Sequence, residues 1–180
     1  SIFLIPSGVN PNEFNFSDKK EDELVNYLKG QYPTLTSLDT TKPIVLFIGA
    51  YERKGLDRAL ESLQDHQNYQ FIIIGKPEQS SGMNFKPNPN HFFITFTKEV
   101  NLFYELADTF IFPTRYEPFG LVIIEAYAMG LDLIVPRENV GAAEIIPTSD
   151  GIYFISQKNK LVIPKLEKIS IAKKRQRRIE

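Results

Sequence analysis

Residues 44–63, "IVLFIGAYERKGLDRALESL", predict a buried strand, a turn and an amphipathic helix in direct succession. The first residues are apolar without interruption, which is typical of a strand covered on both faces of a parallel sheet. Apolar residues then return at the spacing of one helix face: Leu56, Ala59, Leu60 and Leu63. A strand followed closely by a helix is the repeating unit of α/β folds.

The same alternation continues along the chain. Further short apolar runs are predicted strands: 2–5, 71–74, 92–96, 109–112, 133–135 and 152–155. Helical patterns lie over 98–108 and 119–130, and the second ends at Gly130, which suits a helix C-cap. We therefore predict an α/β fold with a doubly wound, Rossmann-like parallel sheet.

Composition divides the chain into three segments. Residues 1–42 comprise a strand that leads into the domain and a polar connecting excursion with one candidate helix, "EDELVNYLKG". Residues 43–160 carry the main alternation of strands and helices, and residues 161–180 form a basic tail or helix. This tail allows three interpretations: a helix that crosses back to another domain, a contact with anionic lipid, or a solvated segment.

Bulk composition excludes several classes of protein. The 180 residues are 42% apolar with a net charge of −1, so overall charge indicates no nucleic-acid or membrane partner. The chain has no cysteine, and its two histidines are too few for a zinc cluster without carboxylate help. It begins Ser-Ile-Phe with no signal peptide, and its apolar runs are too short to span a bilayer. We expect a cytoplasmic protein, cut from a longer chain.

The turn after the first quoted strand suits a diphosphate. In a doubly wound sheet, ligands bind beyond the carboxyl ends of the strands, where helix N-termini favour anions. Gly49 closes the strand, and Arg53 and Lys54 stand beside the start of the next helix. The alternative is a solvated basic turn. The stretch matches neither a P-loop nor a GxGxxG fingerprint.

Residues 113–130, "PTRYEPFGLVIIEAYAMG", place two glutamates around a helix start. The first helix amides have no internal partner, so those of Phe119, Gly120 and Leu121 are predicted to be open. Glu125 lies five residues beyond Gly120, roughly 7.5 Å along the axis, and Glu117 precedes the amides. Carboxylates accept bonds from hydroxyls and amides bind phosphate, so the row fits a sugar, a diphosphate and a ribose. The alternative is structural: Glu117 favours the helix dipole and Glu125 pairs with an arginine.

Two further stretches are weaker candidates. In "ENVGAAEII" (138–146), Gly141 and the alanines after it predict a loop that leads into a short helix facing the same edge of the sheet. Phe96 lies at the carboxyl end of a predicted strand, where it is a candidate for lining a nucleotide base pocket.

Taken in order, these segments resemble the C-terminal half of retaining glycosyltransferases of the GT-B fold, glycosyltransferase family 4. The resemblance runs from about residue 2 to about residue 155. It rests on five segments in family order: "IPSGVNPNEF", "IVLFIGAYERKGLDRALESL", "FIIIGKP", "FYELADTFIFPTRYEPFGLVIIEAYAMGLDLIVP" and "VGAAEII". In the fourth, two glutamates bracket seven residues, as in the family signature.

The resemblance implies a role for each candidate residue. Glu117 would contact hydroxyls of the donor sugar beside the anomeric carbon, and Glu125 would hold the ribose hydroxyls. The diphosphate would be bound by a larger set: Gly49, Arg53, Lys54, Phe119, Gly120 and Leu121. Lys54 and Glu117 would be the catalytic residues. Two positions depart from the family pattern: Ala50 replaces a common arginine, and Asp132 replaces a usual proline, which we expect to affect only the local turn.

The resemblance also implies a reaction. The donor would be a UDP-, GDP- or ADP-linked sugar, transferred with retention of anomeric configuration and without a metal or other cofactor. The acceptor would be a saccharide or a lipid-linked saccharide in the synthesis of cell-surface polysaccharide or lipopolysaccharide. The enzyme would act in the cytoplasm, with a peripheral site on the inner face of the membrane as a further expectation.

Only the donor-binding half of such an enzyme is present in these 180 residues. The N-terminal half, which would bind the acceptor, is absent, so we expect this chain alone to bind nucleotide weakly and to transfer nothing. A non-catalytic nucleotide-sugar-binding or regulatory module is the alternative function. A dehydrogenase is disfavoured because "GAYERKG" lacks the glycine-rich turn, and a nucleic-acid binder because the body of the chain is nearly neutral.

Overall fold

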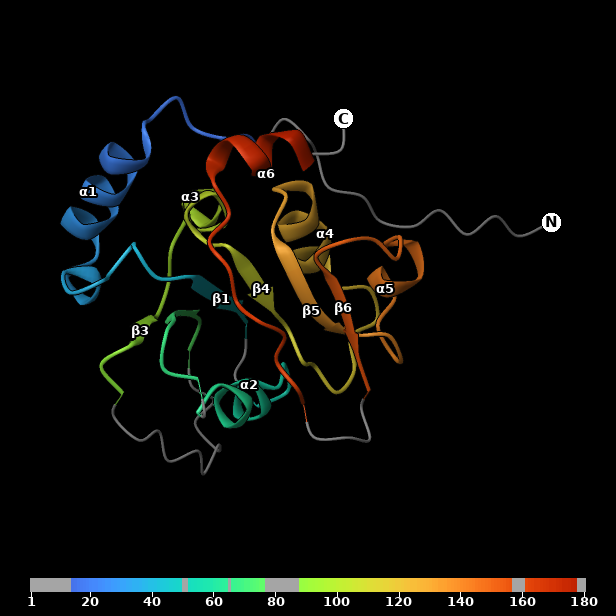
Figure 1. Ribbon diagram of the computed structural model, residues 1–180. Coiled ribbons are helices and arrows are strands. Elements are labelled where there is room, and N and C mark those ends of the chain that lie inside the picture. Colours follow the sequence, from blue (N-terminus) through green and yellow to red (C-terminus); the bar gives the residue numbers. More distant parts are fainter. Residues whose placement is uncertain (1–13, 50–51, 65, 77–87, 157–160, 178–180) are drawn as a thin grey trace.

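The computed structural model describes residues 14–49, 52–64, 66–76, 88–156 and 161–177 (Figure 1). Its strands form one six-stranded sheet in the order β3-β2-β1-β4-β5-β6, and all of its strand pairs are parallel. The strands are β1 (Ile44–Ile48), β2 (Gln70–Ile74), β3 (His91–Ile94), β4 (Thr109–Ile111), β5 (Asp132–Pro136) and β6 (Ile152–Ile155). The predicted doubly wound parallel sheet is confirmed. The strand predicted over 2–5 lies outside the described residues.

Helices connect the strands and lie at both ends of the sheet. They are α1 (Glu21–Gln31), α2 (Leu56–Leu63), α3 (Val100–Leu106), α4 (Leu121–Ala128), α5 (Ala142–Ile145) and α6 (Ile171–Arg177), with a 3₁₀ turn at Pro33–Leu35. Figure 1 shows α6 at one end of the sheet, close to α3 and α4, and α2 at the opposite end. The helix predicted to begin near Phe119 begins at Leu121 with Gly120 as its N-cap.

The continuous apolar strands are buried because elements cover the sheet on both sides. Every residue of β2 and β4 is buried. Phe110 stacks on Phe112 with ring centroids 5.7 Å apart, and Phe112 also contacts Phe47 of β1. The stretch expected to be a connecting excursion contributes to the same core through three residues of α1: Leu24, Val25 and Leu28.

The sheet order places two distant parts of the chain side by side. β1 and β4 are neighbours at the centre of the sheet, although β2 and β3 lie between them in sequence. The chain runs outward from β1 toward β3 and from β4 toward β6, so the strand order reverses between β1 and β4. The loops that leave β1 and β4 therefore meet at the switch point, where ligands bind in doubly wound sheets.

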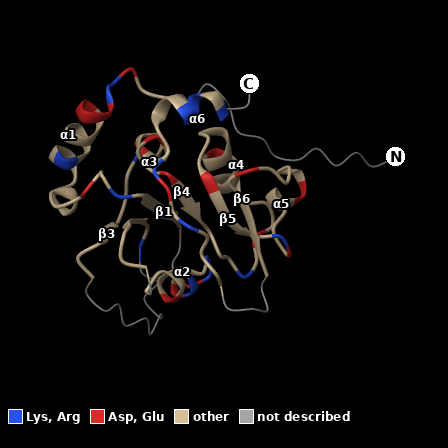
Figure 2. Cartoon of the chain, in the orientation of Figure 1, with Lys and Arg blue, Asp and Glu red and all other residues tan. Residues whose placement is uncertain are grey.

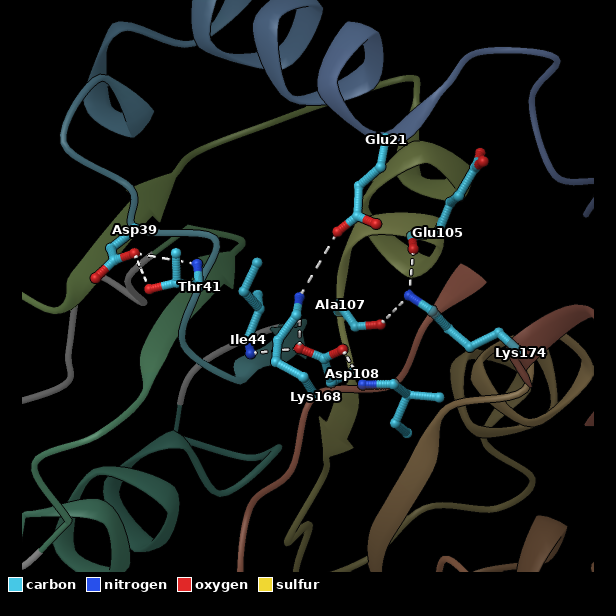
Figure 3. A network of polar contacts seen from close by, with 10 residues as sticks. Glu21, Asp39, Thr41, Ile44, Glu105, Ala107, Asp108, Lys168 and Lys174 are labelled. Atoms are coloured by element: carbon cyan, nitrogen blue, oxygen red, sulfur yellow. Dashed lines mark hydrogen bonds and ion pairs between the residues drawn. The ribbon is translucent and has the colours of Figure 1, made fainter. Parts of the chain in front are cut away.

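The amino ends of the central strands are joined by one buried carboxylate (Figure 3). Asp108, at the start of β4, is fully buried. Its Oδ2 accepts a 2.7 Å hydrogen bond from the amide of Ile44, and its Oδ1 accepts a 2.8 Å bond from the amide of Ile169. Lys168 Nζ lies 3.2 Å from Oδ2. Asp108 thus ties β1 and β4 to the C-terminal segment.

The C-terminal helix binds the same end of the sheet through its basic side chains, which are blue in Figure 2. Lys174 is 1% exposed, and its Nζ donates to the carbonyl oxygens of Glu105 and Ala107 at the end of α3. A cation at a helix C-terminus is electrostatically favourable, whereas burial lowers the pKa of Lys174 to about 8. The ammonium is therefore held by the two carbonyl groups that it contacts.

A second basic residue of α6 corrects an expectation about Asp132. Arg177 donates a 2.6 Å hydrogen bond to Asp132 Oδ1. Burial raises the pKa of Asp132, and its bond from Arg177 acts in the opposite direction. The expectation that Asp132 affects only its local turn is wrong, because this side chain holds the C-terminal helix.

The described helices are all too short or too polar to cross a membrane. Several basic residues of the tail are engaged within the chain: Lys168, Lys174 and Arg177 as above, and Arg175, which donates to the carbonyl of Ser17 at 3.2 Å. Lys165 and Lys173 are exposed.

We predict that Asp108→Asn lowers the free energy of unfolding by about 3 kcal/mol, because the amide cannot serve as an acceptor for both backbone N–H groups and leaves Lys168 without its anion. Urea unfolding followed by circular dichroism measures this change. Asp39→Asn is the matched control, since the carboxylate of Asp39 is only partly buried and contacts Thr41 and Lys42 of its own turn. Equal stability of the two variants would contradict the role given to Asp108.

Candidate functional site

The loops after β1 and β4 touch backbone to backbone. Gly55 is the N-cap of α2 and has φ +81°, in the left-handed region. A Cβ on Gly55 would lie 2.2 Å from the carbonyl oxygen of Pro113, so only glycine fits there. Thr114 adds a second link, since its hydroxyl lies 3.2 Å from the carbonyl oxygen of Arg53 and 3.1 Å from that of Tyr116.

This contact brings together the two residues that the sequence proposes as catalytic. Lys54 Nζ and Glu117 Oε2 form an ion pair, and each side chain is 13% exposed. The lysine also lies over the ring of Phe112, with Nζ 5.3 Å from the ring centroid. Burial lowers the pKa of Lys54, and the positive charge of Arg53 adds to this effect. The pair is therefore held in a partly dry environment, where charges interact more strongly than in water.

Gly49 makes room for the lysine. It closes β1 with φ +138°, and a Cβ at this position would lie 3.0 Å from Lys54 Cγ. Arg53, which directly precedes Lys54, is exposed, and its guanidinium makes no ion pair within the described residues. The site thus holds one lysine that is already paired and one arginine that is open to solvent.

The turn that begins α4 is fixed by the segment after β5. The amide of Glu117 donates to the carbonyl of Asn139 at 3.0 Å, and the amide of Ala142 donates to the carbonyl of Phe119 at 2.7 Å. A Cβ on Gly141 would lie 2.4 Å from the carbonyl oxygen of Pro118. The short helix predicted in this segment is confirmed as α5, and its start supports the turn.

Gly120 gives that turn a left-handed backbone that favours glycine. It has φ +93°, and a Cβ there would lie 3.1 Å from Glu117 Cγ and 3.0 Å from Ile123 Cδ1. Across the described parts of the chain, the amides of Phe119, Gly120 and Leu121 have no hydrogen-bond acceptor. The open amides predicted at this helix start are therefore present next to the Lys54–Glu117 pair.

Glu125 has a partner that the sequence did not reveal. The hydroxyl of Tyr104, on α3, donates a 2.8 Å hydrogen bond to Glu125 Oε2. Burial raises the pKa of Glu125, and the bond from Tyr104 acts against that rise. No ion pair involves Glu125 in the described structure, so the alternative of an arginine partner is wrong. Tyr104 looked like an ordinary core aromatic in the predicted helix over 98–108.

Two candidates lie at the margin of the site. Phe96 follows the edge strand β3 and is 65% exposed. Because β2 separates β3 from β1, Phe96 lies farther than Lys54 from the switch point between β1 and β4. Leu121 is also exposed, at the first position of α4.

Two cavities lie at the other end of the sheet. They measure about 260 Å³ and 200 Å³, and both are lined by Asp150 and Arg177. Both adjoin the amino ends of β5 and β6, whereas ligands of doubly wound sheets bind beyond the carboxyl ends. They surround the Arg177–Asp132 contact that holds the tail. Among the described residues, no group of three or more acidic or histidine side chains is arranged to hold a metal ion.

Comparison with known sequences identifies relatives along most of the chain. The family glycosyl transferases group 1 matches residues 33–180. An uncharacterized glycosyltransferase of Methanocaldococcus jannaschii is 26% identical over 169 residues, which cover 88% of this chain and 42% of that protein. A probable sucrose-phosphate synthase of Thermosipho melanesiensis is 32% identical over 168 residues, which cover 86% of this chain and 36% of that protein. The chain spans about two-fifths of the length of these relatives.

Solved structures share the fold. Sucrose-phosphate synthase from Thermosynechococcus elongatus superposes with a TM-score of 0.67 at 22% identity, over 88% of this chain and 40% of that one. Anabaena HepE in complex with UDP-glucose gives 0.64 at 16% identity, over 85% and 43%. The C-terminal domain of a glycosyl transferase group 1 family protein from Francisella tularensis gives 0.57 at 16% identity, and there the match covers 85% of this chain and 82% of that one.

The match thus covers most of a C-terminal domain solved by itself and less than half of the longer sucrose-phosphate synthase chain. Since the family match covers residues 33–180, the chain belongs to the glycosyl transferases group 1 family and is a glycosyltransferase domain with the fold of the C-terminal half of a GT-B enzyme.

Proposed function

We propose that this chain binds the nucleotide-diphosphate sugar donor of a retaining hexosyltransferase. The observation that carries the proposal is the contact between Lys54 and Glu117 beside the open amides of residues 119–121. A cation and open N–H groups suit phosphate oxygens, and carboxylates suit sugar hydroxyls. Two neighbours in fold were solved with nucleotides: Anabaena HepE with UDP-glucose, and starch synthase IV of Arabidopsis thaliana with ADP and acarbose.

Each residue has a role in this proposal. Lys54 and Arg53 bind the diphosphate together with the amides at the start of α4. Glu117 accepts hydrogen bonds from the donor sugar, and Glu125 accepts them from the ribose. Phe96 borders the base. Gly49 and Gly120 are needed because side chains there would meet Lys54 and Glu117.

The chemistry follows from where charge develops. When the bond at the anomeric carbon breaks, the sugar becomes positive and the departing diphosphate becomes more negative. Lys54, Arg53 and the helix amides stabilise that phosphate, which is the kind of electrostatic contribution that dominates in many enzymes. Glu117 lies beside the phosphate-binding lysine, so it orients the sugar. The phosphate itself takes the proton of the acceptor hydroxyl, and the configuration is retained.

The rest of the reaction belongs to a larger protein. We propose that an N-terminal half binds a saccharide or lipid-linked acceptor, and that the chain described here transfers nothing by itself. Relatives include an O-antigen biosynthesis glycosyltransferase of Escherichia coli and an alpha-monoglucosyldiacylglycerol synthase of Acholeplasma laidlawii. The O-antigen enzyme supports the narrower proposal of cell-surface polysaccharide or lipopolysaccharide synthesis, and we propose that the enzyme acts in the cytoplasm. Exposed Lys165 and Lys173 are the tail residues that would meet an anionic membrane surface.

Nucleotide binding is the direct test. Isothermal titration of this chain with UDP, GDP and ADP and with their glucose conjugates is expected to show binding of at least one series. Sugar transfer to saccharide acceptors is expected to be undetectable. Binding of none of these nucleotides would sink the proposal, and efficient transfer by the chain alone would refute the assignment of the acceptor site to another half.

Lys54→Gln is predicted to weaken binding of the nucleoside diphosphate about tenfold, because one charge-assisted contact to phosphate is lost. Titration calorimetry measures this change. Arg115→Gln is the matched control: Arg115 is an exposed cation of the same edge, but it pairs with Asp57 of α2. A similar loss in both variants would mean that only the general positive field matters.

Glu117→Gln is predicted to affect binding of the nucleoside diphosphate and binding of its sugar conjugate differently. Lys54 loses its partner and becomes available to phosphate, so the nucleoside diphosphate binds about fivefold more tightly, the equivalent of roughly 1 kcal/mol for a partly exposed ion pair. The sugar conjugate gains less, because its hydroxyl acceptor is weakened. The measured quantity is the ratio of the two dissociation constants, and an unchanged ratio argues against sugar contact by Glu117.

A further inference from the structure

Tyr104 is a buried phenol whose hydroxyl contacts α4. Its ring is fully buried and packs edge-on against Phe110 of β4 with centroids 5.9 Å apart, and Phe14 tilts against it at 6.2 Å. Its hydroxyl lies 2.8 Å from Glu125 Oε2 and 3.3 Å from the carbonyl oxygen of Val122. Because a phenol has one proton to donate, the shorter bond to the carboxylate is the dominant one.

The two oxygens of Glu125 are in different situations. Oε2 accepts the bond from Tyr104, whereas Oε1 has no partner among the described residues and is not sealed from solvent. Among the described residues, no lysine or arginine forms an ion pair with the carboxylate of Glu125, so no cation neutralises its negative charge. An ionised carboxylate with one oxygen held and one open is arranged to accept hydroxyl groups from outside.

We propose that Tyr104 is a positioning residue that presents Glu125 to the vicinal hydroxyls of the nucleotide ribose. This inference rests on the proposed function, since the ribose contact of Glu125 belongs to it. Tyr104 does two things here. Its wedged ring fixes the position of the hydroxyl, and the hydroxyl fixes one oxygen of Glu125, so the rotation of the carboxylate is set before a ligand arrives. A contact that is organised in advance loses less entropy on binding.

The bond also favours the ionised form of Glu125. Burial raises the pKa of Glu125 and the bond from Tyr104 lowers it, while burial and the nearby negative charge raise the pKa of the phenol well above its usual value. The shared proton therefore belongs to Tyr104, and the bond opposes the protonation of Glu125 that burial favours. A protonated Glu125 would instead present a donor to part of its surroundings and lose one acceptor site.

Ribose preference separates this role from a structural one. The wild-type chain is titrated with the nucleoside diphosphate that it binds among UDP, GDP and ADP, and with the 2′-deoxy and 3′-deoxy forms. The wild type is expected to prefer the ribonucleotide by about tenfold, and Tyr104→Phe to reduce that preference to less than about threefold. Tyr69→Phe is the control, because Tyr69 is equally buried and loses a 2.8 Å bond to His91 at the amino end of β2, away from the site.

Glu125→Gln makes failure of this inference distinguishable from failure of the proposed function. If Glu125→Gln loses the ribose preference and Tyr104→Phe keeps it, Tyr104 is structural only and the inference is overturned while the ribose site stands. If Glu125→Gln keeps the preference, or the wild type binds none of the nucleotides, the proposed function and this inference fall together. If Tyr69→Phe changes the preference as much as Tyr104→Phe, the inference is also overturned.

A measurement without ligand completes the test. Carbon-detected NMR titration of the Glu125 carboxyl is expected to show a higher pKa in Tyr104→Phe than in the wild type, because the bond that lowers it is gone. If Tyr104→Phe does not fold, 3-fluorotyrosine at position 104 takes its place: the more acidic phenol donates a stronger bond, so the pKa of Glu125 falls. An unchanged pKa in the variant that folds overturns the inference.

Discussion

The approach of Gly55 to the carbonyl of Pro113 is the constraint on which the site depends. It joins the loop after β1 to the loop after β4, and it permits no side chain between them. Lys54 precedes that glycine and Glu117 follows that proline by a few residues, so the ion pair between them is a direct result of the backbone contact. Parallel strands at the switch point bring the loops near each other, and the glycine sets how near.

The two ends of the sheet are stabilised in different ways. At the amino end, Asp108 is surrounded by amides and a lysine, and Lys174 binds the end of α3 (Figure 3). Arg177 also holds the C-terminal helix, through Asp132. Asp108 and Lys174 are paired by the chain itself, whereas Glu105 Oε1 is buried there without a hydrogen-bond partner. At the carboxyl end, the amides at the start of α4 and one oxygen of Glu125 have no partner in the described chain. These groups lie beyond the carboxyl ends of the strands, which is where a ligand of a doubly wound sheet is expected.

The sequence predicted the features that depend on local pattern. Continuous apolar runs predicted each strand of the described sheet. A strand that is covered on both faces has apolar residues at successive positions instead of alternating apolar and polar ones. The assignment of Lys54 and Glu117 to one site came from the family resemblance, and the adjacency of β1 and β4 in the structure accounts for their contact. The open amides of residues 119–121 followed from the start of a helix.

Contacts that join distant parts of the chain could not be predicted in the same way. Glu125 was predicted to bind a ligand, and Tyr104 lies within a predicted helix. Nothing in the spacing of the two residues indicated that one donates a hydrogen bond to the other. Asp132 appeared as a local substitution, but its partner Arg177 lies on the last helix. Lys174 appeared to be one charge in a solvated run, and only the packing of α6 on α3 makes it a buried residue. Periodicity reports which face of an element is covered, but not by what.

The resting partnership of Lys54 with Glu117 has a consequence for selectivity. Inorganic phosphate or another simple anion at the lysine competes with Glu117 for its charge, and full separation would leave the mostly buried glutamate without its cation. Arg53, which is open to solvent, can attract such ions but cannot hold them alone. A molecule that carries hydroxyls next to its phosphates satisfies both members of the pair at once. If the proposed function holds, the pair therefore favours a ligand that carries both groups over a small anion.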